Sequence, residues 1–282
     1  MTDTLYDPRW VREFYDAYGM QEWERFDRHP MMRIAFAIHQ HYLRQYLQPG
    51  QRILEIGAGA GKFTQVLAEL GVRITVADIS PGQLALNRQQ AAAHGFAHAV
   101  EAWVECDACD LRSCFANESF DAVVAYGGLL SYVFDQAGAA LSEMQRVVRS
   151  GGPIFLEVMS LWGGVHRYLM PVLTLAPDVN RQIIANGDLD ERLGIQLNHH
   201  CRMYRAGAWR QLLQEHGLAI EVMTASNALC TNWEEHLRAI PENSAAWQHL
   251  LEMEVEACRE PGCLDLGTHI IAVCRKAKDG RS

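Results

Sequence analysis

The stretch that decides the fold is Arg52-Ile-Leu-Glu-Ile-Gly-Ala-Gly-Ala-Gly-Lys62, a short apolar run followed by three glycines at alternate positions. The run has the composition of a buried strand, and the residues from Lys62 to Leu70 have a helical pattern that Gly71 ends. Because glycine has no Cβ, such a turn lets the backbone approach a ligand closely, and the free N–H groups at the helix start favour a polar or anionic group. The segment therefore predicts a strand, a ligand-binding turn and a helix.

Downstream of this turn, apolar runs alternate with helical patterns as far as residue 160, which is typical of a parallel sheet built from strand–helix–strand units. One helix is predicted to begin with Ser80 as N-cap and Pro81 as its first residue, with Gln83 as the return arm of a capping box. The fold class is therefore α/β. Further strands are predicted at 72–77, 100–106, 120–125, 153–158, 218–224 and 269–274, and helices at about 80–95, 135–149 and 208–216.

Three segments do not fit the alternation. Residues 8–48 have helical spacing and are predicted to form an N-terminal cap. Residues 160–205, rich in Met, His and aromatic residues, and residues 229–263, with a helix through Trp247, are predicted insertions. We expect one domain over 1–282, with the ligand-binding core at 50–160, and a disordered tail from about Lys276.

The composition limits the possible partners. The chain has 282 residues and a formal net charge of −9, and its few lysines and scattered arginines do not form a broad basic face. Nucleic-acid binding is therefore not expected. No stretch approaches the roughly 20 uninterrupted apolar residues that span a bilayer, and charged residues interrupt any signal-peptide core. We expect a cytoplasmic protein without a membrane partner.

The cysteines do not predict a metal or disulfide framework. Eight cysteines are too dilute for a disulfide scaffold. Cys106 and Cys109 form one Cys-x-x-Cys pair with Cys114 nearby, but no second pair lies at zinc-finger spacing. We therefore predict reduced thiols and no bound metal.

The glycine spacing distinguishes between nucleotide-like cofactors. Dinucleotide-binding turns have Gly-x-Gly-x-x-Gly, whose third glycine would fall at position 62, where this chain has Lys62. The glycines are instead at 57, 59 and 61, and Glu55 precedes them on the strand. A second acid, Asp78, ends the next predicted strand, and Asp107 ends the third.

This combination of Glu55-Ile-Gly-Ala-Gly-Ala-Gly61 with acids at two further strand ends resembles the class I S-adenosylmethionine-dependent methyltransferase family, in its small-molecule type. The resemblance covers about residues 50–160 and, more loosely, the strand order to the C-terminus. It implies a Rossmann-like, mostly parallel seven-stranded sheet with helices on both faces, and S-adenosylmethionine as cofactor.

The resemblance also implies site residues. The three glycines would pass beneath the methionine part of the cofactor, Asp78 would accept hydrogen bonds from the ribose hydroxyls, and Asp107 would contact the adenine amino group. A carboxylate suits both ribose hydroxyls, and ligands of open α/β sheets bind at the carboxyl ends of strands. The candidate cofactor-binding residues are Glu55, Gly57, Gly59, Gly61, Asp78, Ile79, Asp107, Ala108, Tyr126, Gly127, Tyr15 and Tyr18.

The segment from Tyr126 to Tyr132 follows the fourth strand, where this family places the transferring methyl group. It contains two glycines and two tyrosines, whose aromatic faces can stabilise a sulfonium charge. It lacks the Asn/Asp-Pro-Pro-Tyr tetrad with which the family binds a planar amide or a base amine. Methylation of nucleic-acid bases or of protein glutamine is therefore disfavoured.

The acceptor is expected beneath the segments outside the alternation. Tyr15 and Tyr18 of the cap are predicted to close over the cofactor, and the insertion at 160–205 is predicted to be a lid, with the twin glycines 163 and 164 as its hinge. A hydroxyl or ammonium acceptor needs a base, and a histidine near its ordinary pKa serves at neutral pH. The candidate catalytic residues are His199, His200, His166 and Tyr132.

The sequence thus predicts transfer of a methyl group from S-adenosylmethionine to an O or N atom of a small molecule. The acidic total favours a neutral or cationic acceptor over a polyanion. An NAD(P)-dependent oxidoreductase and a non-catalytic cofactor-binding module remain alternatives. The acceptor itself and the choice between a monomer and a homodimer stay open.

Overall fold

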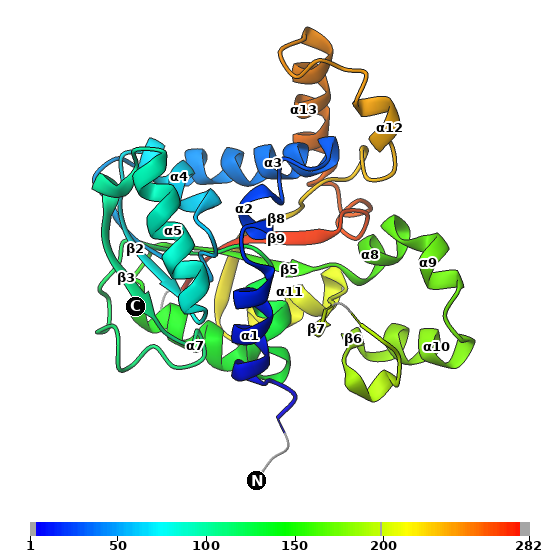
Figure 1. The fold of residues 1–282 in the computed structure, drawn as a ribbon, viewed down its shortest axis with the longest axis horizontal. Coiled ribbons are helices and arrows are strands. Elements are labelled where there is room, and N and C mark those ends of the chain that lie inside the picture. Colours follow the sequence, from blue (N-terminus) through cyan, green and yellow to red (C-terminus); the bar gives the residue numbers. More distant parts are fainter. Residues whose placement is uncertain (1–3, 198, 277–282) are drawn as a thin grey trace, which may run out of the picture.

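The computed structural model describes residues 4–197 and 199–276, and at its centre lies one seven-stranded sheet in the order β3-β2-β1-β4-β5-β9-β8 (Figure 1). All neighbours are parallel except β9, which runs antiparallel to both β5 and β8. The predicted Rossmann-like, mostly parallel sheet is therefore confirmed. The strands are β1 (Arg52–Ile56), β2 (Arg73–Asp78), β3 (Val100–Glu105), β4 (Ala122–Ala125), β5 (Pro153–Met159), β8 (Leu218–Ala225) and β9 (His269–Lys276).

Two apolar layers hold the sheet between its helices. On β1, Ile53 packs toward one face, and Leu54 packs toward the other, as the two-residue period of a strand requires. One face is covered by α3 (Pro30–Tyr46), α4 (Lys62–Glu69) and α5 (Pro81–Ala93). The other is covered by α7 (Ala137–Val147) and α11 (Ala206–Glu215), whose Trp209 is completely buried. Short helical turns lie at α6 (Leu129–Tyr132), Ala97–Ala99 and Phe134–Gln136.

The N-terminal cap consists of α1 (Pro8–Tyr18), α2 (Gln21–Glu24) and α3, as the helical spacing predicts. Its contact with α5 differs from the predicted capping box. The Ser80 hydroxyl accepts from the Gln83 N–H as expected, but the Gln83 side-chain amide donates to the carbonyls of Tyr15 and Gly19. The amide therefore ties α5 to the end of α1, while the Ser80 N–H, which a capping box would pair with Gln83, donates to the Asp78 carboxylate instead.

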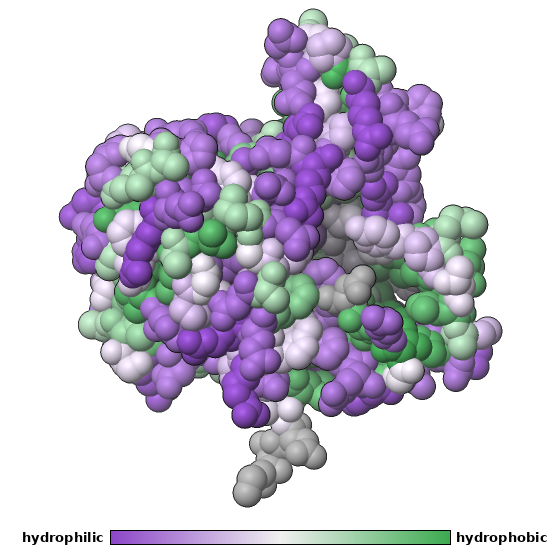
Figure 2. Space-filling view, in the orientation of Figure 1, coloured by the Kyte–Doolittle hydropathy of each residue, from purple (hydrophilic) through white to green (hydrophobic). Residues whose placement is uncertain are grey.

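The first insertion forms a separate lobe. It contains α8 (Leu161–Arg167), α9 (Leu169–Leu173), α10 (Pro177–Asn186), the turn Glu191–Leu193 and a small sheet of β6 (Asp188–Leu189) and β7 (Cys201–Arg202). Its two ends meet, since the Leu161 N–H donates to the Tyr204 carbonyl and the Tyr204 N–H donates to the Met159 carbonyl. Apolar side chains gather on its outer face (Figure 2), where Met170 and Leu173 are among the most exposed.

The second insertion stands on α3 and contains α12 (Glu234–Leu237) and α13 (Ala245–Ala257) (Figure 1). Trp247 of α13 is buried against Met31 and Ile34 of the cap. The carboxylate of Glu254 is fully buried and accepts from three consecutive N–H groups, those of residues 228–230. The insertion is thus fixed to the body by packing and by one satisfied carboxylate.

No helix among the described residues combines the length and the apolar character that crossing a bilayer requires. The disordered tail was predicted from about Lys276; Lys276 itself ends β9, and residues 277–282 lie outside the described residues.

The twin glycines 163 and 164 are not a loop hinge as predicted, because both lie inside α8. The Ser160 hydroxyl caps this helix by accepting from the Gly163 N–H. A Cβ at Gly163 would lie 1.6 Å from the carbonyl oxygen of Gly267, whereas a Cβ at Gly164 would come no closer than 3.4 Å to the Met203 sulfur. Gly163 therefore serves close packing between two backbone segments.

These two glycines give a matched pair of variants. We expect Gly163→Ala to destabilise the protein by about 1–3 kcal/mol, because the backbone must shift to admit a methyl group. Gly164→Ala should be neutral or stabilising by up to about 1 kcal/mol, because alanine is the better helix former. Urea unfolding followed by circular dichroism measures both. Equal loss of stability in the two variants would contradict the packing explanation.

Candidate active site

A cavity opens at the carboxyl ends of β1, β2 and β4, beneath α1 and α2. Ile56 and Gly57 lie on its floor at the end of β1, and Asp78 lies at the end of β2. Tyr15 and Glu22 of the cap lie in its wall. The cavity therefore occupies the position at which open α/β sheets bind their ligands.

The glycine turn comes close to the cavity at two of its three glycines. Gly57 and Gly59 both line the cavity and both have positive φ angles, 67° and 53°. A Cβ at Gly57 would lie 2.6 Å from Leu129, and one at Gly59 would lie 2.9 Å from Glu22. Gly61 is not part of the cavity lining; it precedes α4 with a φ of 103°, and its Cβ position faces the Asn87 amide at 3.0 Å. Its contact with the cofactor stays a prediction.

The Asp78 carboxylate connects the glycine turn after β1 with the turn between β2 and α5. One oxygen accepts from the Gly59 N–H at 2.8 Å, and the other accepts from the Ser80 N–H at 2.9 Å. The side chain is buried, and burial raises the pKa of Asp78 to about 6 despite these hydrogen bonds. Each oxygen keeps a lone pair that can accept from a ligand hydroxyl.

The other two predicted acids, Glu55 and Asp107, do not line the cavity. Glu55 is buried beneath the turn, where it accepts from the Thr64 hydroxyl at 2.7 Å, and burial raises its pKa to about 8. Asp107 accepts from the Cys109 N–H and lies beside Tyr6, which lines the cavity. Ile79, which follows Asp78, and Ala108, which follows Asp107, do line the cavity.

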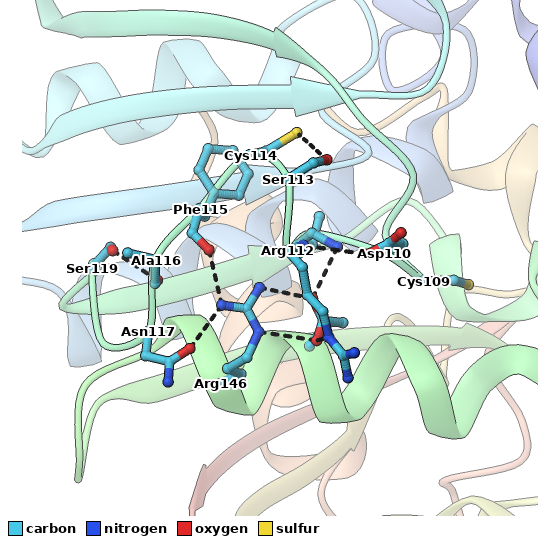
Figure 3. Close-up of polar contacts among 12 residues, drawn as sticks. Cys109, Asp110, Arg112, Ser113, Cys114, Phe115, Ala116, Asn117, Ser119 and Arg146 are labelled. Carbon is cyan, nitrogen blue, oxygen red and sulfur yellow. Dashed lines mark hydrogen bonds and ion pairs between the residues drawn. The ribbon is translucent and has the colours of Figure 1, made fainter.

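The loop after β3 forms the wall at this end of the cavity, and Arg146 of α7 fixes its shape (Figure 3). The Arg146 guanidinium donates to the Phe115 carbonyl at 2.9 Å and to the Asn117 side-chain oxygen at 3.0 Å. It also pairs with Glu143, whose carboxylate accepts from the Leu111 N–H. The loop is therefore held by charge-assisted hydrogen bonds.

The three cysteines of this region do not form one cluster. Cys106 lines the cavity, and burial raises the pKa of its thiol, with Cys114 nearby. Cys109 points toward the Gln136 carbonyl. Among residues 4–197 and 199–276, no group of three His, Cys, Asp or Glu side chains is placed to hold a metal ion.

The predicted aromatic residues divide between the cavity and the core. Tyr15 and Tyr132 line the cavity edge to face, with ring centroids 5.4 Å apart. Tyr18 stacks on Phe14 outside the lining. Tyr126 lines the cavity, but its ring packs against Phe155 and the buried His39 of α3.

The three predicted histidines lie in different places. His199 approaches the cavity, with Nδ1 3.4 Å from the Tyr132 hydroxyl. His200 turns the other way and stacks on Trp10 at 4.3 Å in a separate outer cavity. His166 is exposed on α8, and its ring faces the Leu266 carbonyl. Only His199 of the three is therefore close to the predicted methyl-transfer position.

Sequence reasoning missed a buried group beside Gly127. The Glu157 carboxylate of β5 accepts from the Gly127 N–H at 2.5 Å and lies 3.0 Å from His39 Nε2. The other nitrogen of His39 lies 2.7 Å from the Ala35 carbonyl, which has no proton to give, so His39 donates there. His39 and Glu157 therefore share a proton, and the His39, His269 and Arg25 side chains hold the pKa of Glu157 below its usual range despite its burial.

Two further cap residues were also missed. Glu22 lies over Gly59, and Arg25 lies 3.3 Å from the Glu22 carboxylate. A Cβ at Gly127 would come within 3.6 Å of the Arg25 guanidinium. The charged cap residues Glu22 and Arg25 therefore lie against the backbone that follows β1 and β4. In the sequence, only the density of aromatic residues at 14–26 indicated that the cap contacts the site.

Residues present in the cavity fit a nucleoside cofactor with an amino-acid end. The Asp78 carboxylate can accept from two ribose hydroxyls, and Gly57 and Gly59 bring the backbone itself into the cavity lining. Glu22 offers a carboxylate in the cavity wall, where it is paired with Arg25 behind it.

Comparisons with known proteins agree with this geometry. A methyltransferase domain family matches residues 53–152. The demethylmenaquinone methyltransferase of Clavibacter sepedonicus is 38% identical over 107 residues, 38% of this chain and 40% of that protein. The ubiquinone/menaquinone biosynthesis C-methyltransferase UbiE of Stenotrophomonas maltophilia is 30% identical over 141 residues, 46% of this chain and 54% of that protein. The match thus spans about half or less of these relatives' lengths.

A solved structure shares the fold over nearly the whole chain. It is a putative methyltransferase in complex with the Trm112 methyltransferase activator of Haloferax volcanii. The TM-score is 0.59 at 18% identity, and the superposition covers 96% of this chain and 100% of that one. At this identity the likeness shows the fold alone.

The role of Asp78 has a pH signature. Because its pKa is about 6, the carboxylate is ionised above that pH and protonated below it. We expect the affinity for S-adenosylhomocysteine to be constant above about pH 7 and to fall by up to about tenfold per pH unit below pH 6. Asp78→Asn should bind at least about tenfold more weakly at pH 8 and lose this pH dependence. Calorimetric titration between pH 5 and 8 measures both effects.

Asp16 supplies the matched control, since its carboxylate lies nearby and accepts from the Ser80 hydroxyl and the Gly82 N–H. Asp16→Asn should keep an affinity within about threefold of the wild type, because we place no cofactor contact on it. Wild-type affinity in Asp78→Asn would show that the carboxylate does not hold the cofactor.

Proposed function

We propose that this chain, which belongs to the class I S-adenosylmethionine-dependent methyltransferases through its residues 53–152, transfers a methyl group to an O or N atom of a small molecule. The observation that carries the proposal is the pairing of Asp78 with the glycine turn at the cavity on the carboxyl ends of β1, β2 and β4. When bound, the cofactor supplies a methyl group that its sulfonium charge already activates.

The protein's own task is then mainly positioning. Methyl transfer is an in-line displacement, so the acceptor atom must be held on the axis of the breaking bond in a site without water. Gly127 and Tyr132 line the cavity where the methyl group is expected, and Tyr15 closes it from the cap. Since Gly127 is anchored to Glu157, this wall of the site is fixed from the interior of the sheet.

The acceptor would enter past His199. This side chain contacts the Tyr132 hydroxyl and packs near Phe14 at 5.2 Å, so it lies between the lid and the cap. Partial desolvation, with a smaller contribution from the Arg25 guanidinium, lowers its pKa, so the ring is neutral at pH 7 and can accept a hydrogen bond from the acceptor. We assign it to substrate contact at the mouth of the site.

A second candidate is methyl transfer to carbon, which the similarity to the C-methyltransferase UbiE favours. The oxidoreductase alternative is weakened by Lys62, which stands where the third glycine of a dinucleotide turn would be and pairs with Asp27 of the cap. A non-catalytic module would bind the cofactor without turnover.

One set of assays separates these functions. Calorimetric titration should show S-adenosylhomocysteine binding and no comparable binding of NADH. Incubation with methyl-labelled S-adenosylmethionine and a panel of small alcohols, phenols, amines and enols should give one product class, and NMR of the product identifies the methylated atom. NADH binding alone would reject methyl transfer, and a carbon-bound methyl group would reject the O or N assignment.

The adjacent histidines provide a further test once an acceptor is found. His199→Asn should raise the acceptor KM about tenfold with a smaller change in kcat, because it removes a contact made before and during the reaction. His200→Asn should change neither by more than about twofold, since His200 stacks on Trp10 in the outer cavity. A larger effect from His200→Asn would contradict the placement of the acceptor.

A further inference from the structure

The outer end of the first insertion carries a cluster of large apolar side chains that are open to solvent. Met170 is 72% exposed and Leu173 is 64% exposed, which are the highest values among the large apolar residues of the described chain. The cluster lies on and beside α8, α9 and α10, on the face of the lobe where Figure 2 shows apolar residues together. We call it the apolar tip, and its members are Trp162, Tyr168, Leu169, Met170, Leu173 and Ile184.

The apolar tip is one ordered surface and not a set of scattered residues. The Arg205 guanidinium lies 5.5 Å from the Trp162 ring and donates to the Ile184 carbonyl, so it connects α8 with α10. The Asn180 side-chain amide donates to the Val172 carbonyl at 2.9 Å, which connects α10 with α9. A contiguous exposed apolar surface of this kind marks an interaction site.

The α9 helix has an unusual composition for a helix at the surface. Its five residues, Leu169-Met-Pro-Val-Leu173, are all apolar, and none of them is buried. A surface helix normally has one polar face, whereas a helix that is apolar on all sides normally lies in apolar surroundings. Since α9 lies at the outer end of the lobe (Figure 1), the described part of the chain does not provide such surroundings.

Aromatic and basic side chains border this helix. The Arg205 guanidinium lies over the ring of Trp162, and the Arg167 guanidinium lies 6.0 Å from the ring of Tyr168. Tryptophan and tyrosine are enriched where the hydrocarbon of a bilayer meets its headgroups, and arginines beside them can reach lipid phosphates. The order of an apolar turn, an aromatic border and basic groups thus matches the layers of a bilayer surface.

The charge of the lobe differs from that of the whole chain. Residues 161–205 contain five arginines and four acids, a net charge of +1, although the chain as a whole has a net charge of −9. Asp178 is the only acid between residues 161 and 187, where Arg181 is exposed on α10. Each arginine close to an anionic membrane contributes about 1 kcal/mol of attraction, so the local charge favours anionic lipid.

The apolar tip is less suited to a second copy of this chain or to a groove of another protein. A stable protein interface uses about 20–30 residues of each partner, and the tip has six large apolar side chains. Two copies would also bring together chains that each carry a net charge of −9. A rigid groove covers one side of a helix, whereas acyl chains surround an inserted turn on all sides.

We propose that the apolar tip docks this protein on an anionic lipid surface, with α9 inserted among the acyl chains below the headgroups and with Arg181 and Arg205 at the lipid phosphates. The expectation of no membrane partner rested on the absence of a spanning stretch. Docking needs no such stretch, because an interfacial segment enters only about 5–10 Å into the bilayer. The proposal does not depend on methyl transfer.

Sedimentation of the full chain with vesicles tests this docking. We expect the protein to bind vesicles of equal parts phosphatidylcholine and phosphatidylglycerol more strongly than vesicles of phosphatidylcholine alone. Met170→Gln should lower the partition coefficient at least about threefold, and Met170→Gln combined with Leu173→Gln at least about tenfold. Met253→Gln is the matched control, because Met253 is 46% exposed on α13 of the other insertion, and it should leave binding unchanged.

A second pair of variants tests the charge. Arg181→Gln should weaken binding to the anionic vesicles about fivefold and leave binding to phosphatidylcholine unchanged. Arg44→Gln, which changes an exposed arginine on α3, should affect neither. All substituted side chains are exposed, so the unfolding midpoints of the variants should stay close to that of the wild type, and circular dichroism checks this.

Three results would overturn the proposal. They are no binding of the wild type to anionic vesicles, equal binding of the wild type and the Met170 and Leu173 double variant, and equal binding of the wild type to both kinds of vesicle. Analytical ultracentrifugation distinguishes the second copy. A dimer that the double variant abolishes, without vesicle binding, would assign the tip to self-association and reject the lipid surface.

Discussion

The rest of the site depends on one buried carboxylate, that of Glu157. It accepts from the Gly127 N–H just after β4 and faces His39 of the cap, while its own backbone is part of β5. Three parts of the chain far apart in sequence are thus fixed against a single charged group. Removing such a group would leave a buried partner unpaired, so the arrangement is stable only when all three parts are in place.

The fold was predictable because its signals are local. A strand, a glycine turn and a helix follow one another between residues 52 and 70, and the parallel sheet follows from repetition of that unit. The part of the site built on this unit, Gly57, Gly59 and Asp78, was predictable for the same reason. Gly61 and Glu55 show the limit of the motif, since both support the turn from outside the cavity.

The buried polar group behind Gly127 was not predictable in this way. It is formed by Arg25, which follows α2, and by His39 of α3, Glu157 of β5 and His269 of β9, and no spacing in the sequence relates these residues. Gln83 shows the same difficulty at smaller scale. Its position fits a capping box, yet the Ser80 N–H donates to Asp78 and the Gln83 amide donates to two carbonyls of the cap, Tyr15 and Gly19, which are distant in the sequence.

The two ends of the first insertion are hydrogen-bonded to each other, and this has a consequence for how such proteins diversify. Because Met159 and Leu161 are hydrogen-bonded to Tyr204, the chain leaves the body and returns to it at one point. A segment whose ends already touch can be lengthened, shortened or exchanged at little cost to the rest of the fold. Recombination at this junction would change the outer lobe and His199 together, while leaving the cofactor cavity and Glu157 untouched.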